Sequence, residues 1–434
     1  MYQAPRGTQD VLPTDIAYHT FVESKARRFA SLYGYQELRT PTFEETGLFQ
    51  RGAGESTDVV EKEMYSFRDK GDNDITLRAE GTAPVVRAYL QHGMHTLPQP
   101  VRLFSLISVF RYDRPQAGRL REHHQLDCEA IGEDDPLLDG ELIALLWRFY
   151  EALGLRDLSL QINSIGDANC RPAYLELLRT YYRGHQAELC GDCRRRLEVN
   201  PLRLLDFKVP TCQPIAQKAP SLIDHLCDEC AEHYQRVLAV VGEEKIPVVP
   251  NPRLVRGFDY YTRTVFEVWP QRTGEQSALG GGGRYDGLAE QLGGKHTPGV
   301  GFGTGIERLV LNLKEQGVEV PASPGPQVYV VHLGTGTEPA ANSFARELRA
   351  HGVPTLRGVG TRSMRARLRH ADAARVRWVV VFGEDEVKDG KVTLRDMAAT
   401  EPETLSTEAA LERIKRDEQM QTHLGSGTFS MESS

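Results

Sequence analysis

The chain lacks any apolar stretch long enough to cross a bilayer, and no apolar run follows the charges of its first ten residues. These absences exclude a membrane-spanning protein and argue against a secretory leader. Cysteine is scarce as well, because only seven are spread through 434 residues. An odd, dispersed set is unlike the dense disulfide framework of small secreted domains. We therefore expect a cytoplasmic protein with no membrane partner.

The chain also lacks net positive charge. Its 52 lysines and arginines are outnumbered by 60 aspartates and glutamates, which gives a formal charge of −8. This balance argues against a general polyanion-binding surface, although locally concentrated basic residues can still bind nucleic acid. With 40% hydrophobic residues and no internal repeat, the chain is globular, and its length predicts two or three domains.

Proline and glycine mark one domain boundary. Three prolines and a glycine between Glu319 and Pro326 interrupt regular backbone hydrogen bonding. Beyond them, apolar runs alternate with helical spacing, which predicts a small α/β domain with a largely parallel sheet. The predicted elements are strands at Val328–Leu333 and Trp378–Phe382, and helices at Glu338–His351 and Ser363–Ala374. We place this domain at 326–424 and a disordered tail at 425–434.

The residues before the boundary show a more mixed pattern. A helix is expected at Asp139–Leu153, and strands are expected at Val101–Tyr112, Leu158–Ile162 and Thr264–Trp269. Because these elements do not alternate regularly, we predict an α+β domain over 1–320.

A first cluster of functional character lies at the end of the strand at Val101–Tyr112. Arg111, Arg114, Arg119 and Arg121 fall within eleven residues. Planar guanidinium groups on a strand and its following loop suit bidentate contact with phosphate and carboxylate oxygens. An arginine-rich solvated loop would give the same pattern, so this stretch alone does not decide between the two.

Two further clusters follow along the chain. An Asp-Tyr-Tyr sequence ending at Tyr261 lies between Arg256 and Arg263 just before a strand, a pattern that an ordinary edge strand would share. The run Gly280–Gly283 lets the backbone approach a ligand closely. A glycine run alone is more often a flexible turn, so it is a weak sign of phosphate binding.

Taken together and in this order, these segments resemble the histidyl-tRNA synthetase family of class II aminoacyl-tRNA synthetases, from Arg6 to about Leu411. Three stretches are similar to the three class II motifs, and Leu77–Thr82 is similar to the family's amino-acid-binding loop. The motif stretches are Gly34–Pro41, Phe110–Glu129 and Gly301–Arg308. The segments around Arg256 and Gly282 are similar to two signatures confined to histidine-specific members.

The resemblance implies a fold and an activity. The implied fold is a six-stranded antiparallel sheet flanked by helices, with an insertion at about 168–245 and a C-terminal α/β anticodon-binding domain. It also implies a homodimer with Pro41 near the interface. The implied reaction uses ATP and Mg²⁺ to convert histidine to histidyl-adenylate, and then transfers histidine to the 3′ end of tRNA(His).

The resemblance also assigns residues to that reaction. Arg111 and Arg256 would contact the carboxylate and the α-phosphate from opposite sides as catalytic residues, because positioning and electrostatics supply most of the acceleration. The implied ATP-binding residues are Arg111, Asp113, Arg119, His123 and Arg308, and the implied histidine-binding residues are Glu80, Thr82, Gln125, Glu129, Tyr260, Tyr261 and Tyr285. Glu129 with Tyr261 would recognise the two imidazole nitrogens, and Tyr285 would close the pocket.

Two of the implied ATP-binding residues depart from the family's usual pattern. Asp113 stands where glutamate is usual near the adenine amino group, and His123 stands where phenylalanine usually stacks on adenine. A shorter carboxylate and a different aromatic ring can preserve adenine binding with altered affinity. The arginines and the histidine-pocket residues match, so we expect an active enzyme.

A non-catalytic, histidine-sensing relative built on the same fold is the alternative. Such regulators resemble the catalytic part alone, whereas this chain continues into a domain with seven arginines within 21 residues. They are Arg357, Arg362, Arg365, Arg367, Arg369, Arg375 and Arg377. This concentration predicts tRNA binding, with contacts from Arg362, Arg365 and Arg369, although a solvated helix face would look the same.

Four cysteines form two Cys-x-x-Cys pairs within the expected insertion, Cys190 with Cys193 and Cys227 with Cys230. Two such pairs can supply a tetrahedral site for a structural Zn²⁺. Their separation is wider than in a usual zinc ribbon, and the alternative is reduced thiols packed as small hydrophobic side chains.

Overall fold

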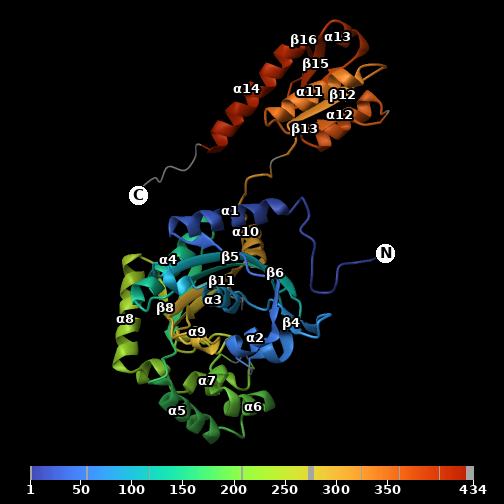
Figure 1. Ribbon diagram of the computed structural model, residues 1–434. Helices are drawn as coiled ribbons and strands as arrows, with labels where there is room; N and C mark the ends of the chain where they lie inside the picture. Colours follow the sequence, from blue (N-terminus) through green and yellow to red (C-terminus); the bar gives the residue numbers. More distant parts are fainter. Residues whose placement is uncertain are drawn as a thin grey trace. The chain divides into compact units, whose positions relative to one another are not determined.

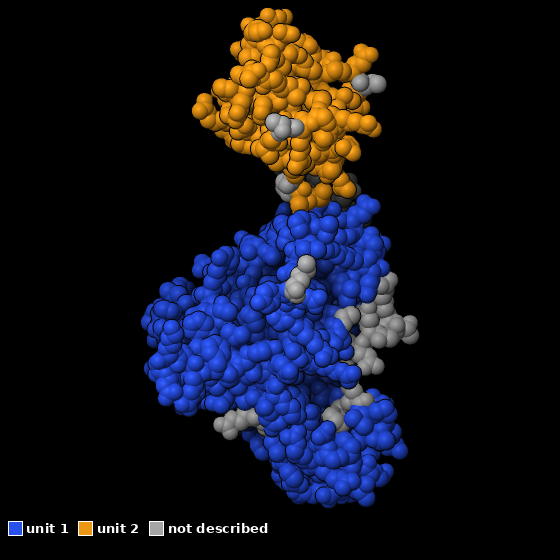
Figure 2. Space-filling view, turned by 90° about the vertical axis from the view of Figure 1, so that its right-hand side faces the viewer, with its two compact units in different colours: residues 1–321 blue, residues 322–434 orange. Residues whose placement is uncertain are grey.

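Figure 1 shows the computed structural model of the chain, which describes residues 2–54, 57–116, 118–206, 209–271, 278–323, 325–360, 362–399 and 401–426. The chain divides into two compact units, residues 1–321 and 322–434 (Figure 2). Over the described ranges, no helix is long and apolar enough to cross a membrane.

The first unit is built on an eight-stranded sheet of order β1-β5-β6-β11-β10-β9-β7-β8. The six inner strands pair antiparallel, whereas β1 joins β5 and β8 joins β7 in parallel. The strands are β1 Gln36–Glu37, β5 Val101–Phe110, β6 Glu122–Ile131, β7 Leu158–Ser164, β8 Val248–Pro250, β9 Thr262–Pro270, β10 Gly280–Arg284 and β11 Gly299–Gly305. The implied six-stranded antiparallel sheet is confirmed, with one short parallel strand added at each edge.

Four helices pack on one face of this sheet around the larger hydrophobic core. They are α1 Ile16–Leu32, α4 Pro136–Ala152, α8 Asp228–Glu243 and α10 Ile306–Glu315. Helix α4 is apolar on most of its surface because it lies between the sheet and α8. Asp135 accepts a hydrogen bond from the Leu137 amide (2.9 Å), and Pro136 occupies the first turn, where an amide donor is not needed.

The other face of the sheet carries a second core and the candidate site. Helices α2 Thr46–Ala53, α3 Thr82–Gln91 and α9 Leu288–Gln291 pack together on that side. A small antiparallel sheet of order β2-β4-β3 precedes α3. Its strands are β2 Phe43–Glu45, β3 Ser66–Arg68 and β4 Asp74–Leu77, and short helical turns lie at Val59–Glu63 and Met94–Thr96.

Helices α5 to α8 lie between β7 and β8, in the stretch expected as an insertion. The first three are α5 Arg171–Gly184, α6 Gly191–Val199 and α7 Gln213–Lys218, with 3₁₀ turns at Pro201–Leu204 and Leu222–His225. They group together below the main sheet in Figure 1, whereas α8 returns to pack on α4. The boundaries of the insertion at about 168 and 245 stay a prediction.

The second unit has a five-stranded sheet of order β13-β12-β14-β15-β16. The strands are β12 Val328–His332, β13 Thr355–Arg357, β14 Trp378–Phe382, β15 Lys391–Asp396 and β16 Glu403–Ser406. β12 pairs in parallel with β13 and β14, but β14 with β15 and β15 with β16 are antiparallel. The prediction of a largely parallel sheet is therefore wrong for half of the pairings. Only the short α13 Glu384–Lys388 joins β14 to β15, and parallel pairing needs a longer crossover.

Helices cover both faces of this second sheet. Helices α11 Glu338–Ala350 and α14 Thr407–Ser426 pack on one face, and α12 Met364–Ala373 packs on the other. Each predicted strand and helix of this unit agrees with the observed element to within one residue at either end. Residues 425 and 426 of the predicted tail end α14, and residues 427–434 lie outside the described part of the chain.

Candidate active site

One face of the two central strands β10 and β11 is almost bare of side chains. Alternate residues of a strand point to the same face of a sheet. On β10 and β11, glycine occupies these positions, with Gly281 opposite Gly303 and Gly283 opposite Gly301. We call these four residues the glycine floor.

The neighbouring strand β6 presents polar side chains to the same face. Asp127 pairs with Gly303 and Glu129 pairs with Gly301. A Cβ at Gly301 would lie 1.7 Å from Glu129 Oε2, and one at Gly303 would lie 2.5 Å from Asp127 Oδ1. The glycines therefore make room for two buried carboxyl groups. The residues on this face of β6 are His123, Gln125, Asp127 and Glu129.

A cavity of about 490 Å³ is lined by two residues of the glycine floor, Gly281 and Gly303, and by all but two of the predicted active-site residues. Those on its wall are Glu80, Thr82, Arg111, Asp113, Arg119, His123, Gln125, Arg256, Tyr260, Tyr261 and Arg308. They come from the loop before α3, from β6 and the loop before it, from the segment before β9 and from α10. The fold thus brings together segments that lie far apart in the sequence.

Three arginines lie close together on the cavity wall. Burial lowers the pKa of Arg308, and the positive charges of Arg119 and Arg111 lower it further. The Arg308 side chain is held by hydrogen bonds from Nε to Gly118 O (2.9 Å) and from Nη1 to Ala278 O (2.7 Å). Like charges held this close are costly until an anion neutralises them. This part of the cavity is therefore suited to a chain of phosphates.

Two strands bring Arg111 and Arg256 to the cavity, because Arg111 directly follows β5 and Arg256 precedes β9. The guanidinium group of Arg111 lies 5.5 Å from the ring centroid of Phe258. Arg256 forms an ion pair with Glu267 and donates a hydrogen bond to Gly281 O (3.2 Å). Both guanidinium groups are thus oriented before a ligand binds.

The two residues that depart from the family pattern both lie on the wall. Burial lowers the pKa of His123 to about 3, and the charge of Arg111 adds to this effect, so the ring is neutral at physiological pH. A neutral imidazole can stack on a base without adding charge. Asp113 forms an ion pair with Arg119 and accepts a hydrogen bond from the Arg114 amide (2.6 Å). Their contact with adenine stays a prediction.

Carboxyl groups gather in another part of the cavity. The two oxygens of Glu80 accept hydrogen bonds from the amides of Thr82 and Ala83 (both 2.8 Å) at the start of α3. Asp127 is buried, and its Oδ2 has no hydrogen-bond partner among the residues that the structure describes. Burial raises the pKa of Asp127 to about 8, and the nearby charge of Glu80 contributes to the rise. Burial raises the pKa of Glu80 as well. Two neighbouring carboxyl groups with raised pKa values suit the ammonium group of a ligand, because its positive charge favours their ionised form.

Glu129 and Tyr285 are the two predicted residues that do not lie on the cavity wall. Glu129 Oε1 accepts a hydrogen bond from Thr82 Oγ1 (2.7 Å), and Oε2 accepts one from the Tyr285 hydroxyl (2.6 Å). Burial raises the pKa of Glu129 well above its usual range, although both hydrogen bonds oppose the rise. Glu129 therefore forms a hydrogen bond with Tyr285. Tyr261, expected to recognise the imidazole together with Glu129, lies on the wall itself, and that shared role stays a prediction.

Tyr260 is the centre of an aromatic group beside these residues. Its ring stacks on Phe258 (5.2 Å between centroids) and contacts Tyr261 (4.7 Å) and Tyr285 (6.0 Å). Its hydroxyl donates to Glu80 Oε2 (3.4 Å). Rigid rings thus link the acidic part of the cavity to the segment that carries Arg256.

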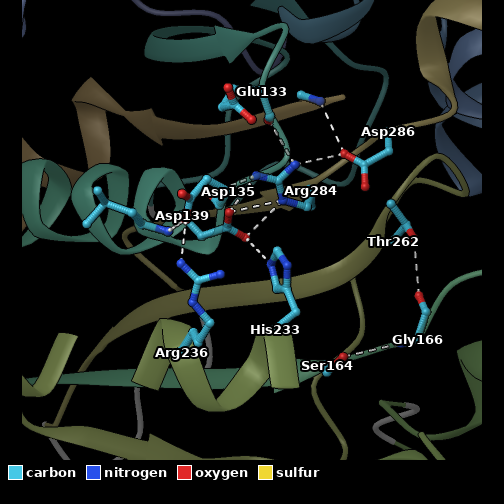
Figure 3. Close-up of polar contacts among 12 residues, drawn as sticks. Glu133, Asp135, Asp139, Ser164, Gly166, His233, Arg236, Thr262, Arg284 and Asp286 are labelled. Atoms are coloured by element: carbon cyan, nitrogen blue, oxygen red, sulfur yellow. Dashed lines mark hydrogen bonds and ion pairs between the residues drawn. The ribbon is translucent and has the colours of Figure 1, made fainter. Parts of the chain in front are cut away.

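A buried ion-pair network fixes the end of β10 (Figure 3). Arg284 is fully buried and contacts Asp139 of α4 (2.7 Å) and Asp286 (3.0 Å). Asp139 also lies 3.2 Å from Nε2 of His233, on α8. Burial alone would raise the pKa of Asp139, but the charge of Arg284 and the hydrogen bonds with His233 and Arg284 together lower this pKa. Because Arg284 directly precedes Tyr285, the network sets the position of that phenol.

Several wall residues with side chains were not predicted from the sequence, and four of them are Asp127, Phe258, Glu267 and Trp269. For Asp127 the signal was present, because it alternates with Gln125 and Glu129 on one strand. The other three lie at or beside the segment that ends at Glu267, and nothing in their spacing showed which side of the backbone faces the cavity.

The arginines expected to contact tRNA are exposed on the second unit. Arg362 lies just before α12, and Arg365 and Arg369 lie on it. Arg367 is only 3% exposed and donates to Gly360 O (2.7 Å), so it supports the loop before the helix. The seven clustered arginines are therefore of two kinds, and contact of the exposed ones with tRNA stays a prediction.

The predicted zinc site of four cysteines is wrong. The structure places Cys190 and Cys193 in one group with Cys212, and Cys227 and Cys230 in another group with Asp167 and Cys170. The two Cys-x-x-Cys pairs begin different helices, α6 and α8, so each pair meets other side chains nearby and not the second pair.

The antiparallel sheet, the arginine-bearing loop between β5 and β6, and the glycine strand β11 leading into Arg308 of α10 together define a class II aminoacyl-tRNA synthetase. The model of the histidyl-tRNA synthetase family matches residues 7–173 and 204–309 of this chain. A model of the anticodon binding domain matches residues 327–417. The chain therefore belongs to the histidyl-tRNA synthetase family.

Individual relatives agree with this assignment. A histidine–tRNA ligase of Dehalococcoides mccartyi is 51% identical over 416 residues, which cover 96% of this chain and 100% of that protein. One of Desulforamulus reducens is 46% identical over 402 residues, or 93% of this chain and 96% of that protein. The crystal structure of apo S. aureus histidyl-tRNA synthetase is 36% identical, with a TM-score of 0.81 and coverage of 96% of this chain and 100% of that one.

Proposed function

We propose that this chain is a histidine–tRNA ligase, which uses ATP to form histidyl-adenylate and transfers the histidyl group to the 3′ end of tRNA(His). The observation that carries the proposal is a single cavity whose wall carries a group of arginines and, in another part, two carboxyl groups with raised pKa values, Glu80 and Asp127. An amino acid held by its ammonium group at Glu80 and Asp127 can extend its carboxylate toward arginines that hold ATP.

Activation requires the histidine carboxylate to attack the α-phosphorus of ATP while pyrophosphate leaves. Arg111 and Arg256 would hold the carboxylate and the α-phosphate, and Arg119 and Arg308 would hold the outer phosphates. Negative charge moves onto pyrophosphate as the bond breaks. Fixed guanidinium groups stabilise this charge without having to reorient.

Mg²⁺ would accompany ATP in the cavity. This ion favours oxygen ligands and usually combines one or two carboxylates with substrate phosphates. Glu267 and Glu307 supply carboxylates on the cavity wall, so the residues present fit the ion. When bound, it would neutralise phosphate charge and orient the leaving group.

Recognition of the histidine side chain would depend on Glu129. A neutral imidazole offers one donor and one acceptor. Its N–H would donate to Glu129, and the hydroxyl of Tyr261 would donate to the other nitrogen. Hydrogen bonds from Thr82 and Tyr285 hold the Glu129 carboxyl group in place. A pocket of buried polar groups discriminates strongly against side chains that leave those groups unpaired.

The second unit would bind tRNA(His) through its anticodon region, with Arg362, Arg365 and Arg369 as phosphate contacts. Exposed arginines on one helix and the loop before it are suited to a phosphate backbone. Large apolar side chains also remain exposed on the small sheet of the first unit, where Phe43 is 54% and Phe67 is 49% exposed. Such exposed side chains, with Phe43 close in sequence to Pro41, support the proposed homodimer.

A non-catalytic histidine sensor is the second candidate. A Bacillus halodurans protein described as an ATP phosphoribosyltransferase regulatory subunit/histidyl-tRNA synthetase shares this fold at 23% identity, with a TM-score of 0.64. That protein covers 88% of this chain, and at this identity the likeness concerns the fold alone. The grouped arginines on the cavity wall and the full-length relative at 51% identity favour the ligase.

Exchange of labelled pyrophosphate into ATP by the purified full-length chain tests the proposal. We expect exchange with histidine and none with glutamine, whose amide does not fill the place of the imidazole ring. Charging of a tRNA(His) transcript with histidine should accompany it. Absence of histidine-dependent exchange would contradict the ligase assignment and favour the sensor.

A further inference from the structure

Four side chains outside the cavity converge from two stretches of the first unit. Asp167 and Cys170 lie at the start of α5, and Cys227 and Cys230 lie at the start of α8. One ligand atom of each residue lies within 4.8 Å of those of the other three. The Cys170 thiol lies 3.7 Å from Asp167 Oδ1. The proposed reaction uses none of these groups.

One pair of these atoms is spaced as the ligands of a small tetrahedral ion are. With Zn–S bonds of about 2.3 Å and Zn–O bonds of about 2.0–2.2 Å, neighbouring ligand atoms are about 3.6–3.8 Å apart. The 3.7 Å between Cys170 Sγ and Asp167 Oδ1 falls in this range. Three sulfurs with one carboxylate favour Zn²⁺ over Mg²⁺ or Ca²⁺, which prefer oxygen ligands alone.

The backbone presents the ligands in two short segments, one before α5 and one at the start of α8. In each segment two residues separate the two ligands, which are Asp167 and Cys170 in the first and Cys227 and Cys230 in the second. Cys170 and Cys227 are the residues that cap the N-termini of α5 and α8. Amide groups at a helix N-terminus stabilise a thiolate, which is the form that binds metal.

Two arginines beside the four side chains can balance the charge of an occupied metal site. Zn²⁺ with three thiolates and one carboxylate carries a net charge of −2. Two arginines adjoin the group: Arg263 forms an ion pair with Asp167 Oδ2 (3.3 Å), and Arg171 follows Cys170 directly. The Asn169 amide donates to Asp167 Oδ1 (2.9 Å), which orients the carboxylate as a ligand.

We propose that Asp167, Cys170, Cys227 and Cys230 bind a structural Zn²⁺ ion that joins α5 to α8. The other group, Cys190 with Cys193 and Cys212, offers three sulfurs among the residues described here, one fewer than a closed structural site needs. The proposal depends on neither the ligase activity nor any residue of the cavity.

The proposed zinc site adjoins the segment that carries Tyr261. Arg171 Nη2 donates to Tyr261 O (2.8 Å), and Thr262 Oγ1 donates to Gly166 O (3.2 Å; Figure 3). The Arg263 amide also donates to Gly166 O (2.8 Å). The backbone φ of Arg263 is 50°, a value that residues other than glycine rarely adopt. The loop before α5 thus holds the start of β9 in place.

Metal content of the full-length chain, purified under reducing conditions, tests the proposal. We expect one bound Zn²⁺ per chain by mass spectrometry, lost on chelation and restored by added Zn²⁺. Added Co²⁺ should give the visible bands of a tetrahedral thiolate site. Cys170→Ser and Cys227→Ser should each lose the ion, whereas the matched variant Cys212→Ser should retain it.

Several outcomes would overturn this assignment. They are absence of Zn²⁺ and of the Co²⁺ bands in the unaltered chain, retention of the ion by both Cys170→Ser and Cys227→Ser, or its loss in Cys212→Ser. X-ray absorption of the unaltered zinc protein requires no variant to fold. Three sulfur neighbours and one oxygen would support the site, and four sulfurs would contradict it. Because none of these measurements uses activity, they stand apart from the ligase assignment.

Discussion

Burial and the positive charges of Arg119 and Arg111 all disfavour the charged form of Arg308 and lower its pKa. Two backbone carbonyls fix its guanidinium group, so the side chain cannot move away from its neighbours. The folded protein therefore carries an electrostatic cost that a bound polyanion relieves. Such preorganisation is effective in catalysis because the cost is met during folding, before the reaction begins.

Arg256→Ala should lower the kcat of histidine-dependent pyrophosphate exchange by about 100- to 1000-fold, since one preorganised contact to the transition state is worth about 2.7–4 kcal/mol. Circular dichroism should show an unchanged secondary structure. The matched control is Arg183→Ala on α5, an arginine whose side chain is 53% exposed and which should have no effect on the rate. Equal rates for Arg256→Ala and the unaltered chain would refute its assigned role.

The pKa of Asp127, raised to about 8 by burial and by Glu80, has a consequence for stability. In the unfolded chain this group ionises near pH 4, so between pH 4 and 8 the folded state binds more protons than the unfolded state. The contribution of Asp127 to stability therefore decreases as pH rises through this window. Below pH 4 both states are protonated, and above pH 8 both are ionised.

Asp127→Asn should remove this pH dependence, because the amide has a similar shape and does not ionise. The Tm of the variant minus that of the unaltered chain should increase from pH 5 to pH 8 and then level off. Thermal unfolding followed by circular dichroism across that range measures it. A Tm difference that is constant with pH would mean that Asp127 has an ordinary pKa. The variant should also bind histidine more weakly, because one partner of the ammonium group is lost.

Eleven of the side chains that line the cavity could be predicted from the sequence because of their chemistry. Arginines and acids in short clusters are rarely needed by the fold alone, so a resemblance in their order carries information about the site. The partner of Glu129 could not be predicted in the same way. Which phenol, Tyr261 or Tyr285, meets this carboxyl group depends on how β10 and β6 lie across β11, a long-range relation.

At the scale of the strand, the glycine floor is the most restrictive feature. Gly303→Ala would place a methyl group 2.5 Å from Asp127 Oδ1, and a buried carboxyl group has little room to move. We expect the KM for histidine to rise at least about tenfold, or about 1.4 kcal/mol, with a smaller change for ATP. The matched control is Gly242→Ala on α8, where no atom lies within 4 Å of the added Cβ. A normal KM in Gly303→Ala would show that the strand adapts.

Chelation tests the contacts between the zinc site and the start of β9. If the metal holds the loop before α5, its removal should raise the KM for histidine more than the KM for ATP, since Tyr261 adjoins the amino-acid side of the cavity. Zn²⁺ added back should restore both constants. If a metal-free chain, verified by mass spectrometry, keeps its normal KM for histidine, the loop holds Tyr261 without the ion.

The elements predicted correctly are those with a strong local pattern. Strand β14 consists of five consecutive buried apolar residues, and β5 shows ten residues of mostly buried side chains. Strands β1 and β8 have two and three residues, too few for any periodicity to appear, and only their pairing with longer strands reveals them. The zinc ligands were misassigned for the same reason, because Asp167 and Cys170 reach α8 only through the tertiary fold.

At the scale of the whole molecule, each unit has hydrophobic cores of its own. A chain ending at Pro321 should therefore keep histidine-dependent pyrophosphate exchange within about twofold. Charging of tRNA(His) should fall at least about tenfold in kcat/KM, equivalent to about 1.4 kcal/mol, because the anticodon contacts are lost. Both rates are measured on the same preparation.

Exchange serves as the internal control for that truncation, since it requires only the small substrates. A shortened chain that charges tRNA as well as the full-length chain would remove the second unit from tRNA recognition. Triple replacement of Arg362, Arg365 and Arg369 by alanine in the full chain should reproduce the charging defect in part, and should weaken the dependence of tRNA binding on salt.

The glycine floor also limits how this gene can vary. At Gly281, Gly283, Gly301 and Gly303, a Cβ would meet another atom at 2.5 Å or less. Glycine is the only amino acid without that atom, so every codon change that is not synonymous introduces the same collision. The four positions are therefore constrained by the Cβ atom alone, whatever chemistry the rest of the new side chain brings. Each of the four positions therefore tolerates no other amino acid without a collision. Substitutions elsewhere that only add stability do not remove that collision.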